Sequence, residues 1–445
     1  MRNNKVLMPV FLTFALLGSA VYSLQEQSKA QAAYDAAVAQ ARDYAGKGVP
    51  LEAIEQYQNA LGMRPSLELC LEAGEVYLAS ENKSGAESWY ETELLAAYPK
   101  QAQTYLYGMK NCAKWGKYSE LFSIYQEYQD RGLHSDEVEQ LAREYQYTYF
   151  LGGDYQEVGA FSRTTKVAAV RYEDRWGYVS AAGKKKGGYV YTAAGQHSEL
   201  TPVVDASGRA LYVDAGGSEK INENFILEKD PGFGTVTRFL EAYSGLLPAF
   251  NGEIWNYYDQ ETFEKRFGGY AGALPVANGV GAVSEDGEKW ALIGTDGQLI
   301  TGFEFDEVLA DDRNVVCRNG VLLVKQGGGY LLVDSKGKQV GSGVYEDASP
   351  FYGSGFAAVK RNGKWLFLDS GGDEHDLGDY EQAQSFFNGM AAVKRDGLWG
   401  YINESGELAI DFTFLDARAF SSSGSCFVMT APDRWQLLRL YSVLS

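Results

Sequence analysis

The distribution of apolar and polar residues divides the chain into three parts. An apolar run extends from Val6 to Leu24 near the N-terminus. From about residue 30 to 150 the apolar positions recur with a helical period. After that, short apolar runs alternate with turn residues, which is typical of many short strands. We therefore predict an α + β multidomain protein: a membrane segment over 1–29, helical repeats over 30–150, and an all-β repeat domain over 151–445.

The N-terminal run has the length of a membrane-spanning helix. Its 19 residues would rise roughly 28 Å at about 1.5 Å each, close to the thickness of a hydrocarbon core. Arg2 and Lys5 precede the run, which predicts an inward N-terminus and an outward bulk. A cleaved signal peptide is the alternative, although Val21-Tyr22-Ser23 lacks a clean Ala-x-Ala site. We expect a single-pass signal anchor in the cell membrane, or else a secreted protein.

The helical segment carries a regular packing pattern. Ala53, Tyr57 and Ala60 recur at spacings of four and three, which places them on one helix face. Pro65 is predicted to end this helix, and Ser66 to cap the next one.

A similar arrangement follows about 34 residues later, at Ala86, Tyr90 and Pro99. These residues resemble the tetratricopeptide repeat, which alternates small and large packing residues across paired helices with a period of 34 residues. The resemblance covers residues 36–132, but the opening Trp and the Leu-Gly pair are mostly missing, so the repeats are degenerate. It implies a concave surface that holds a protein or peptide. A helical spacer is the alternative.

Tryptophans mark a repeat in the second half of the chain. Six of the eight fall at one repeat position, and Ala210 and Tyr330 fill it in two further copies. Successive copies are 34, 45, 35, 40, 35, 34 and 36 residues apart, a period typical of stacked or radial repeats. The predicted structural positions are Trp176, Trp255, Trp290, Trp365, Trp399 and Trp435.

Each unit contains turn patterns at fixed places. Asp396-Gly397 between two apolar runs predicts a hairpin that pairs Val393 with Gly400 and leaves Trp399 on the opposite face. Both faces of such a sheet are apolar, so each sheet needs a neighbour on either side. A second turn places Asp, Asn or Ser three residues before Gly, at Ser180, Asp214, Asp334, Asp369 and Asn403.

A third pattern precedes several hairpins. Two aromatic residues stand six apart, which predicts that both lie on one face of a strand. The pairs are Tyr155 and Phe161, Tyr345 and Phe351, Tyr380 and Phe386, and Phe414 and Phe420.

These units resemble the bacterial WG-repeat family, named for the Trp-Gly that stands here as Trp176-Gly177 and Trp399-Gly400. The resemblance covers residues 155–445, although Gly is replaced after four of the tryptophans. It implies a β-repeat domain that mediates interactions. About eight units with a Trp each suit a β-propeller, which removes exposed sheet edges, and an open β stack is the alternative. A strand from residues 155–170 would then complete the last unit.

The net charge and the cysteine spacing argue against nucleic-acid binding and against a zinc site. A net charge of −19 argues against nucleic acid, because phosphate binding needs a basic face. The four cysteines show no zinc-ligand spacing. Cys70 and Cys112 could pair, but isolated buried thiols are the favoured interpretation.

Residues that could carry chemistry do not form a recognisable constellation. His134, His197 and His375 lie far apart in the sequence, and no G-x-S-x-G motif is present. Asp311 and Asp312 are adjacent, so on a strand they would point apart. We therefore predict no catalytic residues, no cofactor and no metal.

The predicted function is that of a non-catalytic, extracytoplasmic binding or scaffold protein with a protein or peptide partner. Binding of the cell wall or a carbohydrate by the β repeats is the second hypothesis. A hydrolase in a central cavity is the third.

Overall fold

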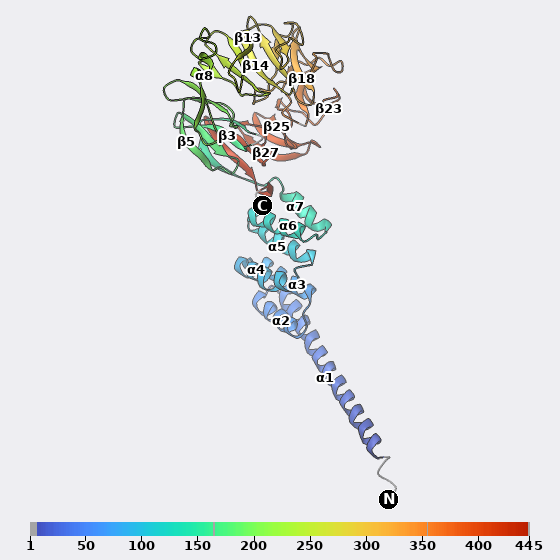
Figure 1. Ribbon diagram of the computed structural model, residues 1–445. Helices are drawn as coiled ribbons and strands as arrows, with labels where there is room; N and C mark the ends of the chain where they lie inside the picture. Colours follow the sequence, from blue (N-terminus) through green and yellow to red (C-terminus); the bar gives the residue numbers. More distant parts are fainter. Residues whose placement is uncertain (1–6, 163–164, 354, 444–445) are drawn as a thin grey trace. The chain divides into compact units, whose positions relative to one another are not determined.

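The computed structural model describes residues 7–162, 165–353 and 355–443, with side chains from residue 25 onward. Its contacts divide the chain into a helical unit, Met1–Thr148, and a β unit, Tyr149–Val443 (Figure 1).

The helical unit consists of consecutive helices in which chain neighbours pack together. They are α1 (Leu7–Gly46), α2 (Pro50–Met63), α3 (Leu67–Ala79), α4 (Lys83–Trp89) continued by a π-helix (η1, Tyr90–Leu95), α5 (Ala102–Lys114), α6 (Tyr118–Asp130) and α7 (Asp136–Tyr145).

No helix within the part of the chain that the structure describes is long and apolar enough to cross a membrane. The predicted membrane segment, Val6 to Leu24, lies outside the residues whose side chains are described.

The predicted packing face of α2 is confirmed. Ala53, Tyr57 and Ala60 are all buried, and α2 ends at Met63, close to the predicted break. Ser66 caps α3, because its hydroxyl accepts a hydrogen bond from the backbone N–H of Leu69 at 3.4 Å.

Two glycines that are 34 residues apart, Gly74 and Gly108, each pack closely against a tyrosine ring. A Cβ added to Gly74 would lie 2.6 Å from the ring of Tyr107, and one added to Gly108 would lie 2.6 Å from the ring of Tyr90. The Tyr107 hydroxyl also donates to the Gly74 carbonyl at 3.1 Å. Small and aromatic residues therefore alternate across the helix pairs, while the tetratricopeptide resemblance itself stays a prediction.

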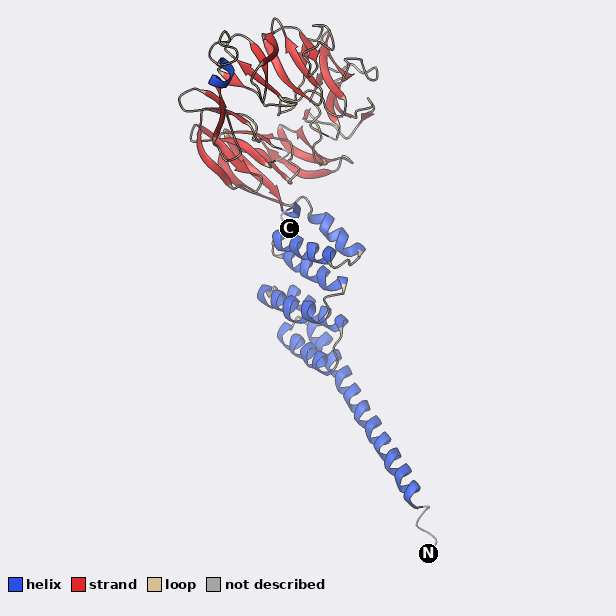
Figure 2. Ribbon diagram, viewed as in Figure 1, coloured by secondary structure: helices blue, strands red, loops and turns tan. Residues whose placement is uncertain are grey.

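The β unit is an eight-bladed propeller of antiparallel sheets (Figure 2). Blade 1 contains β2 (Glu157–Phe161), β3 (Val167–Tyr172), β4 (Arg175–Ser180) and β5 (Lys185–Tyr191). Blade 2 contains β6 (Ala193–Ala194), β7 (Thr201–Val204), β8 (Ala210–Val213) and β9 (Glu219–Asn222), followed by helix α8 (Glu223–Leu227). Blade 3 contains β10 (Arg238–Phe239), β11 (Leu246–Phe250), β12 (Trp255–Asp259) and β13 (Lys265–Tyr270). Blade 4 contains β14 (Gly272–Ala277), β15 (Val280–Ser284) and β16 (Trp290–Ile293).

The second half of the ring repeats this order. Blade 5 contains β17 (Glu307–Val308), β18 (Val321–Gln326) and β19 (Gly329–Asp334). Blade 6 contains β20 (Asp347–Ala348), β21 (Ala357–Arg361), β22 (Lys364–Leu368) and β23 (Glu374–His375). Blade 7 contains β24 (Gln382–Ala383), β25 (Met390–Arg395), β26 (Leu398–Asn403) and β27 (Leu408–Phe414). Blade 8 contains β28 (Asp416–Ala417), β29 (Ser425–Ala431) and β30 (Arg434–Leu440), with a 3₁₀ turn, η2 (Tyr441–Val443), after it.

The ring is closed by β1 (Tyr149–Tyr155), which pairs with β30 and completes blade 8. The propeller and its closure by an early strand are thus confirmed, and the open stack is excluded. The expected position of that strand was wrong, because residues 157–161 already form the first strand of blade 1. A hydrophobic core then joins blade 8 to blade 1, with Phe427 and Trp435 packed against Phe161.

The predicted turns are present. Asp396 and Gly397 both have positive φ, and Val393 lies opposite Gly400 as expected. The second turns also form, since a backbone N–H of Gly donates to the carbonyl three residues before it at 2.8–3.2 Å.

The prediction for the paired aromatics was wrong in one respect. Tyr155 pairs with Trp435 in blade 8, whereas Phe161 pairs with Ala168 in blade 1. Phe414 likewise belongs to β27 of blade 7, and Phe420 follows β28 of blade 8. These two pairs therefore span the crossover between two blades, and their four rings are buried.

Candidate functional site

The tryptophans of the repeat position all lie in the third strand of a blade. Trp176 is in β4, Trp255 in β12, Trp290 in β16, Trp365 in β22, Trp399 in β26 and Trp435 in β30, while Ala210 and Tyr330 hold the same place in β8 and β19.

Several of these residues contribute to cores that two blades share. Trp255 packs with Ala273 of the next blade, and Trp365 packs with Ala391 of the next blade. The Trp365 indole N–H also donates to the carbonyl of Glu381, at the start of blade 7, at 3.0 Å. Trp255 and Trp365 thus hold neighbouring blades together.

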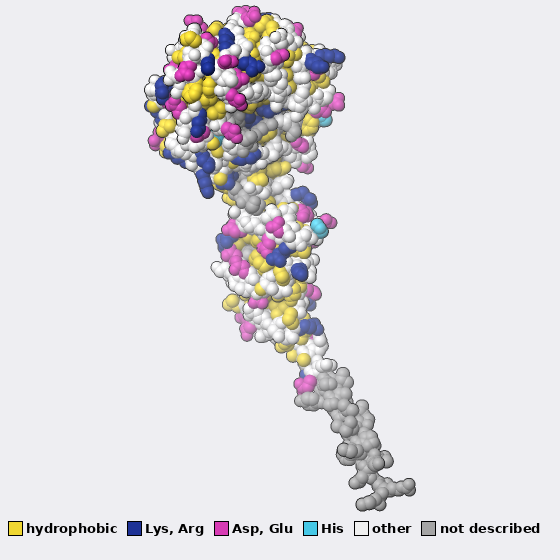
Figure 3. Space-filling model, in the orientation of Figure 1, with side chains coloured by type: hydrophobic (Ala, Val, Ile, Leu, Met, Phe, Trp, Pro, Cys, Tyr) yellow, Lys and Arg dark blue, Asp and Glu magenta, His cyan; other side chains and the backbone are white. Residues whose placement is uncertain are grey.

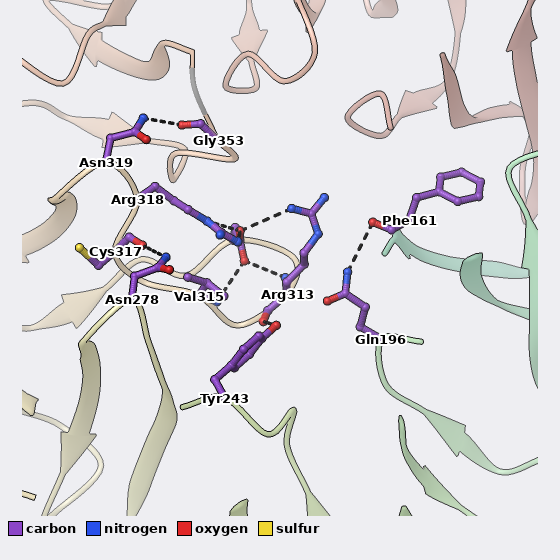
Figure 4. Close-up of polar contacts among 11 residues, drawn as sticks. Phe161, Gln196, Tyr243, Asn278, Arg313, Val315, Cys317, Arg318, Asn319 and Gly353 are labelled. Atoms are coloured by element: carbon purple, nitrogen blue, oxygen red, sulfur yellow. Dashed lines mark hydrogen bonds and ion pairs between the residues drawn. The ribbon is translucent and has the colours of Figure 1, made fainter. Parts of the chain in front are cut away.

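A pocket of about 310 Å³ lies among the loops that connect the first and second strands of the blades (Figure 4). Its walls come from blades 1 to 5, so residues far apart in sequence converge there. They include Ser162, Gln196, Glu241, Tyr243, Asn278, Arg313 and Arg318.

Asp311 organises the longest of these loops. Its carboxylate accepts hydrogen bonds from the backbone N–H groups of Arg313 and Val315 at 2.9 and 3.0 Å. The Arg318 guanidinium also binds it, with Nε at 3.0 Å. Asp311 and Asp312 lie in the loop between β17 and β18 and not on a strand, so the expectation of two strand residues pointing apart does not apply. Instead Asp311 is buried and Asp312 is exposed to solvent.

Glu241 joins three blades at the pocket wall. This buried carboxylate accepts the backbone N–H of Gln196 at 3.0 Å and the side-chain amide of Asn314 at 2.8 Å. Gln196 in turn donates to the carbonyl of Phe161 at 3.4 Å. Asp311 thus has its partners within its own loop, whereas Glu241 has partners from two neighbouring loops.

Arg313 differs from these paired groups. Its side chain is only 6% exposed, yet Nε and Nη1 have no hydrogen-bond partner. Nη1 lies 4.0 Å from Asp311 Oδ2, beyond hydrogen-bond distance. The guanidinium carbon lies 5.1 Å from the ring centroid of Phe387, which belongs to blade 7.

The surrounding protein atoms raise the pKa of two neighbouring residues, although Asp312 keeps an exposed surface. Desolvation raises the pKa of Asp312 to about 6, Asp311 adds to the rise, and Arg313 and Arg418 oppose it. Burial, with Asp312 nearby, raises the pKa of Tyr352 to about 12.

Asparagine side chains link the same loops from blade to blade. Asn278 donates to the Cys317 carbonyl at 2.9 Å, Asn319 to the Gly353 carbonyl at 2.7 Å, and Asn388 to the Ser421 carbonyl at 3.0 Å. These links were not predicted from the sequence. Each Asn precedes Gly and has positive φ, so a second series of Asn-Gly pairs was the available signal.

The three histidines are separate. His134 precedes α7, His375 lies in β23, and His197 lies between β6 and β7 with Nδ1 2.8 Å from the Thr165 hydroxyl. Burial lowers the pKa of His197. Within the described ranges, no three His, Cys, Asp or Glu side chains are grouped to hold a metal ion.

The helical unit has a groove of its own, with a volume of about 570 Å³. It lies between the α1–α2 connection and α3, and Tyr57, Glu72, Glu75 and Val76 contribute to its walls. Glu72 is held by Arg42 at 2.7 Å and by the Tyr57 hydroxyl at 2.9 Å.

The sequence of the last blades matches a known repeat. The family model described as "WG containing repeat" matches residues 332–365, 379–399 and 399–429. Residues 332–429 carry WG repeats. This range extends from the end of β19 in blade 5, through blades 6 and 7, into β29 of blade 8, and it includes Trp365 and Trp399. No curated protein matches the chain.

Among solved structures, BamB from Moraxella catarrhalis is similar at 9% identity and a TM-score of 0.38, over 66% of this chain and 100% of its own. The WD40 β-propeller domain of Doa1 is similar at 13% identity and a TM-score of 0.31, over 65% of this chain and 97% of its own. The propeller fold of this chain is defined by the strand pairing within its eight sheets.

Proposed function

We propose that the chain is a non-catalytic scaffold that binds a protein partner through the groove of its helical unit. The propeller and its WG repeats fit an interaction scaffold. The observation that carries the proposal is the groove, because it combines apolar walls with carboxylates. On the visible face of this unit, hydrophobic side chains also lie at the surface between charged ones (Figure 3).

The chemistry of the groove indicates the kind of partner. Val49, Pro50 and Val76 offer apolar surface, and the exposed Glu75 adds a negative charge at the wall. Since Arg42 already neutralises Glu72, Glu75 is the charge that would select a basic group. The proposed partner is therefore a protein segment with apolar residues and an adjacent Lys or Arg. This assignment includes the tetratricopeptide-like role predicted for residues 30–150.

We further propose that the N-terminal run holds the protein at a bacterial cell membrane, with the bulk outside the cytoplasm. Support comes from the length of the run from Val6 to Leu24 and from Arg2 and Lys5 before it. The full-length protein should resist extraction from membranes by alkaline carbonate, and a chain lacking residues 1–24 should be released. Release of the full-length chain would contradict the anchor, and a shortened mature N-terminus would indicate the secreted alternative.

Photo-crosslinking in cells tests the binding groove. A photoreactive residue at Ala79, which is exposed in the groove, should give a discrete protein adduct. The matched control is the same residue at Glu55, which is exposed elsewhere on α2. Glu75→Lys should abolish the adduct, whereas Glu55→Lys should leave it intact. Equal adducts at both positions, or none at Ala79, would contradict the proposal.

Cell-wall glycan binding is a second candidate with one supporting feature. Tyr172 is 40% exposed, and its ring centroid lies 5.3 Å from that of Tyr189. Such a tyrosine pair offers an amphipathic surface for a sugar. The eight tryptophans, in contrast, are all buried or half-buried. Retention of the protein on purified cell wall, lost in Tyr172→Ser, would favour this candidate.

A further inference from the structure

Two buried nitrogen atoms of the Arg313 side chain, Nε and Nη1, have no hydrogen-bond acceptor in the described structure. A buried charged donor without a hydrogen bond is costly, so most buried polar groups in folded proteins have partners. Arg313 Nε and Nη1 have none, although the side chain is only 6% exposed. The sequence places a second arginine, Arg318, five residues later, and that one is fully engaged with Asp311.

The nearby carboxylates of Asp311 and Glu241 accept hydrogen bonds from other groups and not from the Arg313 side chain. Asp311 binds Arg318 and two backbone N–H groups, and Glu241 binds Gln196 and Asn314. Asp312 is close enough to Arg313 for an electrostatic interaction, but it is exposed and forms no ion pair with it within 4 Å in the described structure. The guanidinium therefore has an unused hydrogen-bonding capacity.

The position of Arg313 is fixed from several sides. Its N–H donates to Asp311, and its carbonyl accepts a hydrogen bond from the Tyr243 hydroxyl at 3.3 Å (Figure 4). Its guanidinium lies over the ring of Phe387. These contacts come from blades 3, 5 and 7, so the side chain is held at the pocket before any ligand arrives. A preorganised donor of this kind loses little entropy on binding.

We propose that Arg313 anchors a binding site for a carboxylate group in the pocket of the propeller. A planar carboxylate accepts paired hydrogen bonds from a guanidinium. A singly charged group also suits the surroundings better than a phosphate dianion, because Asp311, Asp312 and Glu241 are near. Gln196 and Asn278 line the same pocket and supply polar contacts for the rest of the ligand. This inference is independent of the groove in the helical unit.

The carboxylate could belong to the C-terminus of a peptide or to a small organic acid. Isothermal titration calorimetry on the full chain separates these sources. The probes are N-acetyl-trialanine, its C-terminal amide, and succinate. We expect a carboxylate probe to bind about tenfold or more tightly than the amide, since the amide lacks the charge that Arg313 recognises. Tighter binding of the tripeptide indicates a peptide terminus, and tighter binding of succinate indicates a small acid.

Two variants decide whether Arg313 carries the binding. Arg313→Met keeps an apolar stem against Phe387 and should abolish binding of the carboxylate probe, with the melting temperature unchanged or raised. Such stability is expected because the variant removes a buried charge whose Nε and Nη1 donors lack hydrogen-bond partners. Arg209→Gln is the matched control, as Arg209 is an exposed arginine on blade 2 outside the pocket, and it should bind normally. Binding that survives Arg313→Met, or no binding of either carboxylate to the wild type at millimolar concentration, overturns the proposal.

Discussion

Oδ1 of Asp154 lies 2.7 Å from Nε of Arg434, 280 residues further along the chain. Gln436 donates to the same carboxylate at 3.0 Å. Asp154 belongs to β1 and Arg434 to β30, so the two ends of the β unit meet within one blade. Figure 1 shows the last strands of the ring beside the first ones, and the pairing of β1 with β30 covers the edge that β30 would otherwise leave open.

The packing of the buried Tyr155 should stabilise the closed ring more than the exposed ion pair between Asp154 and Arg434 does. Tyr155 is 7% exposed and packs edge-on against Phe427. Tyr155→Ala should lower the free energy of unfolding by about 3–5 kcal/mol, as expected for a large aromatic deleted from a core. Asp154→Ala removes an exposed ion pair, so its effect should be small. Urea unfolding of the two variants checks this order, and equal effects would contradict it.

At the asparagines that link the blades, we predict that substitution by Ala lowers the free energy of unfolding more than substitution by Gly. Asn388 has a φ of 53° and donates to the Ser421 carbonyl. Asn388→Gly keeps the backbone conformation but loses the hydrogen bond, which should cost about 0.5–1.5 kcal/mol. Asn388→Ala adds the left-handed penalty of about 1–2 kcal/mol, so Ala should be worse than Gly.

Asn362 is the control for these variants, measured by the same denaturant unfolding. It also has a φ of 53°, but no interblade hydrogen bond of its side chain is found among the described residues. Asn362→Gly should therefore leave stability nearly unchanged. If Asn388→Gly matches it, the link contributes nothing.

Local patterns predicted the propeller well, because each blade repeats short-range turn chemistry. The spacing of Trp365 and Trp399 fixed the unit, and Asp396-Gly397 fixed the register of its hairpin. The closing strand was harder to predict, since its pairing with Trp435 depends on contacts between residues at opposite ends of the unit.

The pocket could not be predicted, because its groups come from five blades and no short motif joins them. Arg313 looks like any surface arginine in the sequence. Its burial follows from the Asp311 turn and from Phe387, two blades away. Asp311 and Asp312 were noticed as a pair, but their environments differ only because the loop folds inward.

The cysteines are predicted to be unreactive in the folded protein. All four are free and buried. Burial raises the pKa of Cys112 to about 11 and that of Cys70 to about 12, so little thiolate forms near neutral pH. Ellman's reagent should label almost no thiol at pH 7.5 in the native state and four after denaturation. Two reactive thiols in the denatured, unreduced protein would instead reveal a disulfide.

The raised pKa of Asp312 should make its contribution to the stability of the folded protein decrease as the pH rises. Its pKa is raised to about 6 by desolvation, so the folded state retains a proton that the unfolded state releases. Stability should therefore fall as the pH rises from about 4 to about 6 and then level off. Asp311, Arg313, Arg318, Arg418 and Tyr352 also act on this carboxyl. Melting temperatures of the wild type and of Asp312→Asn check the effect, and identical pH profiles would contradict it.

Ring closure is the central claim, because it brings the loops of separate blades around one pocket. Phe150 and Arg439 are cross-strand partners in β1 and β30. Antiparallel partners lie about 4.5–5.5 Å apart between Cα atoms, within the range of a disulfide. The full chain with Phe150→Cys and Arg439→Cys should therefore form this disulfide readily under mild oxidation, detected by mass spectrometry. The mismatched pair Phe150→Cys and Leu437→Cys should form it far less. No cross-link in the matched pair, or equal yields in both, would contradict a ring closed by β1.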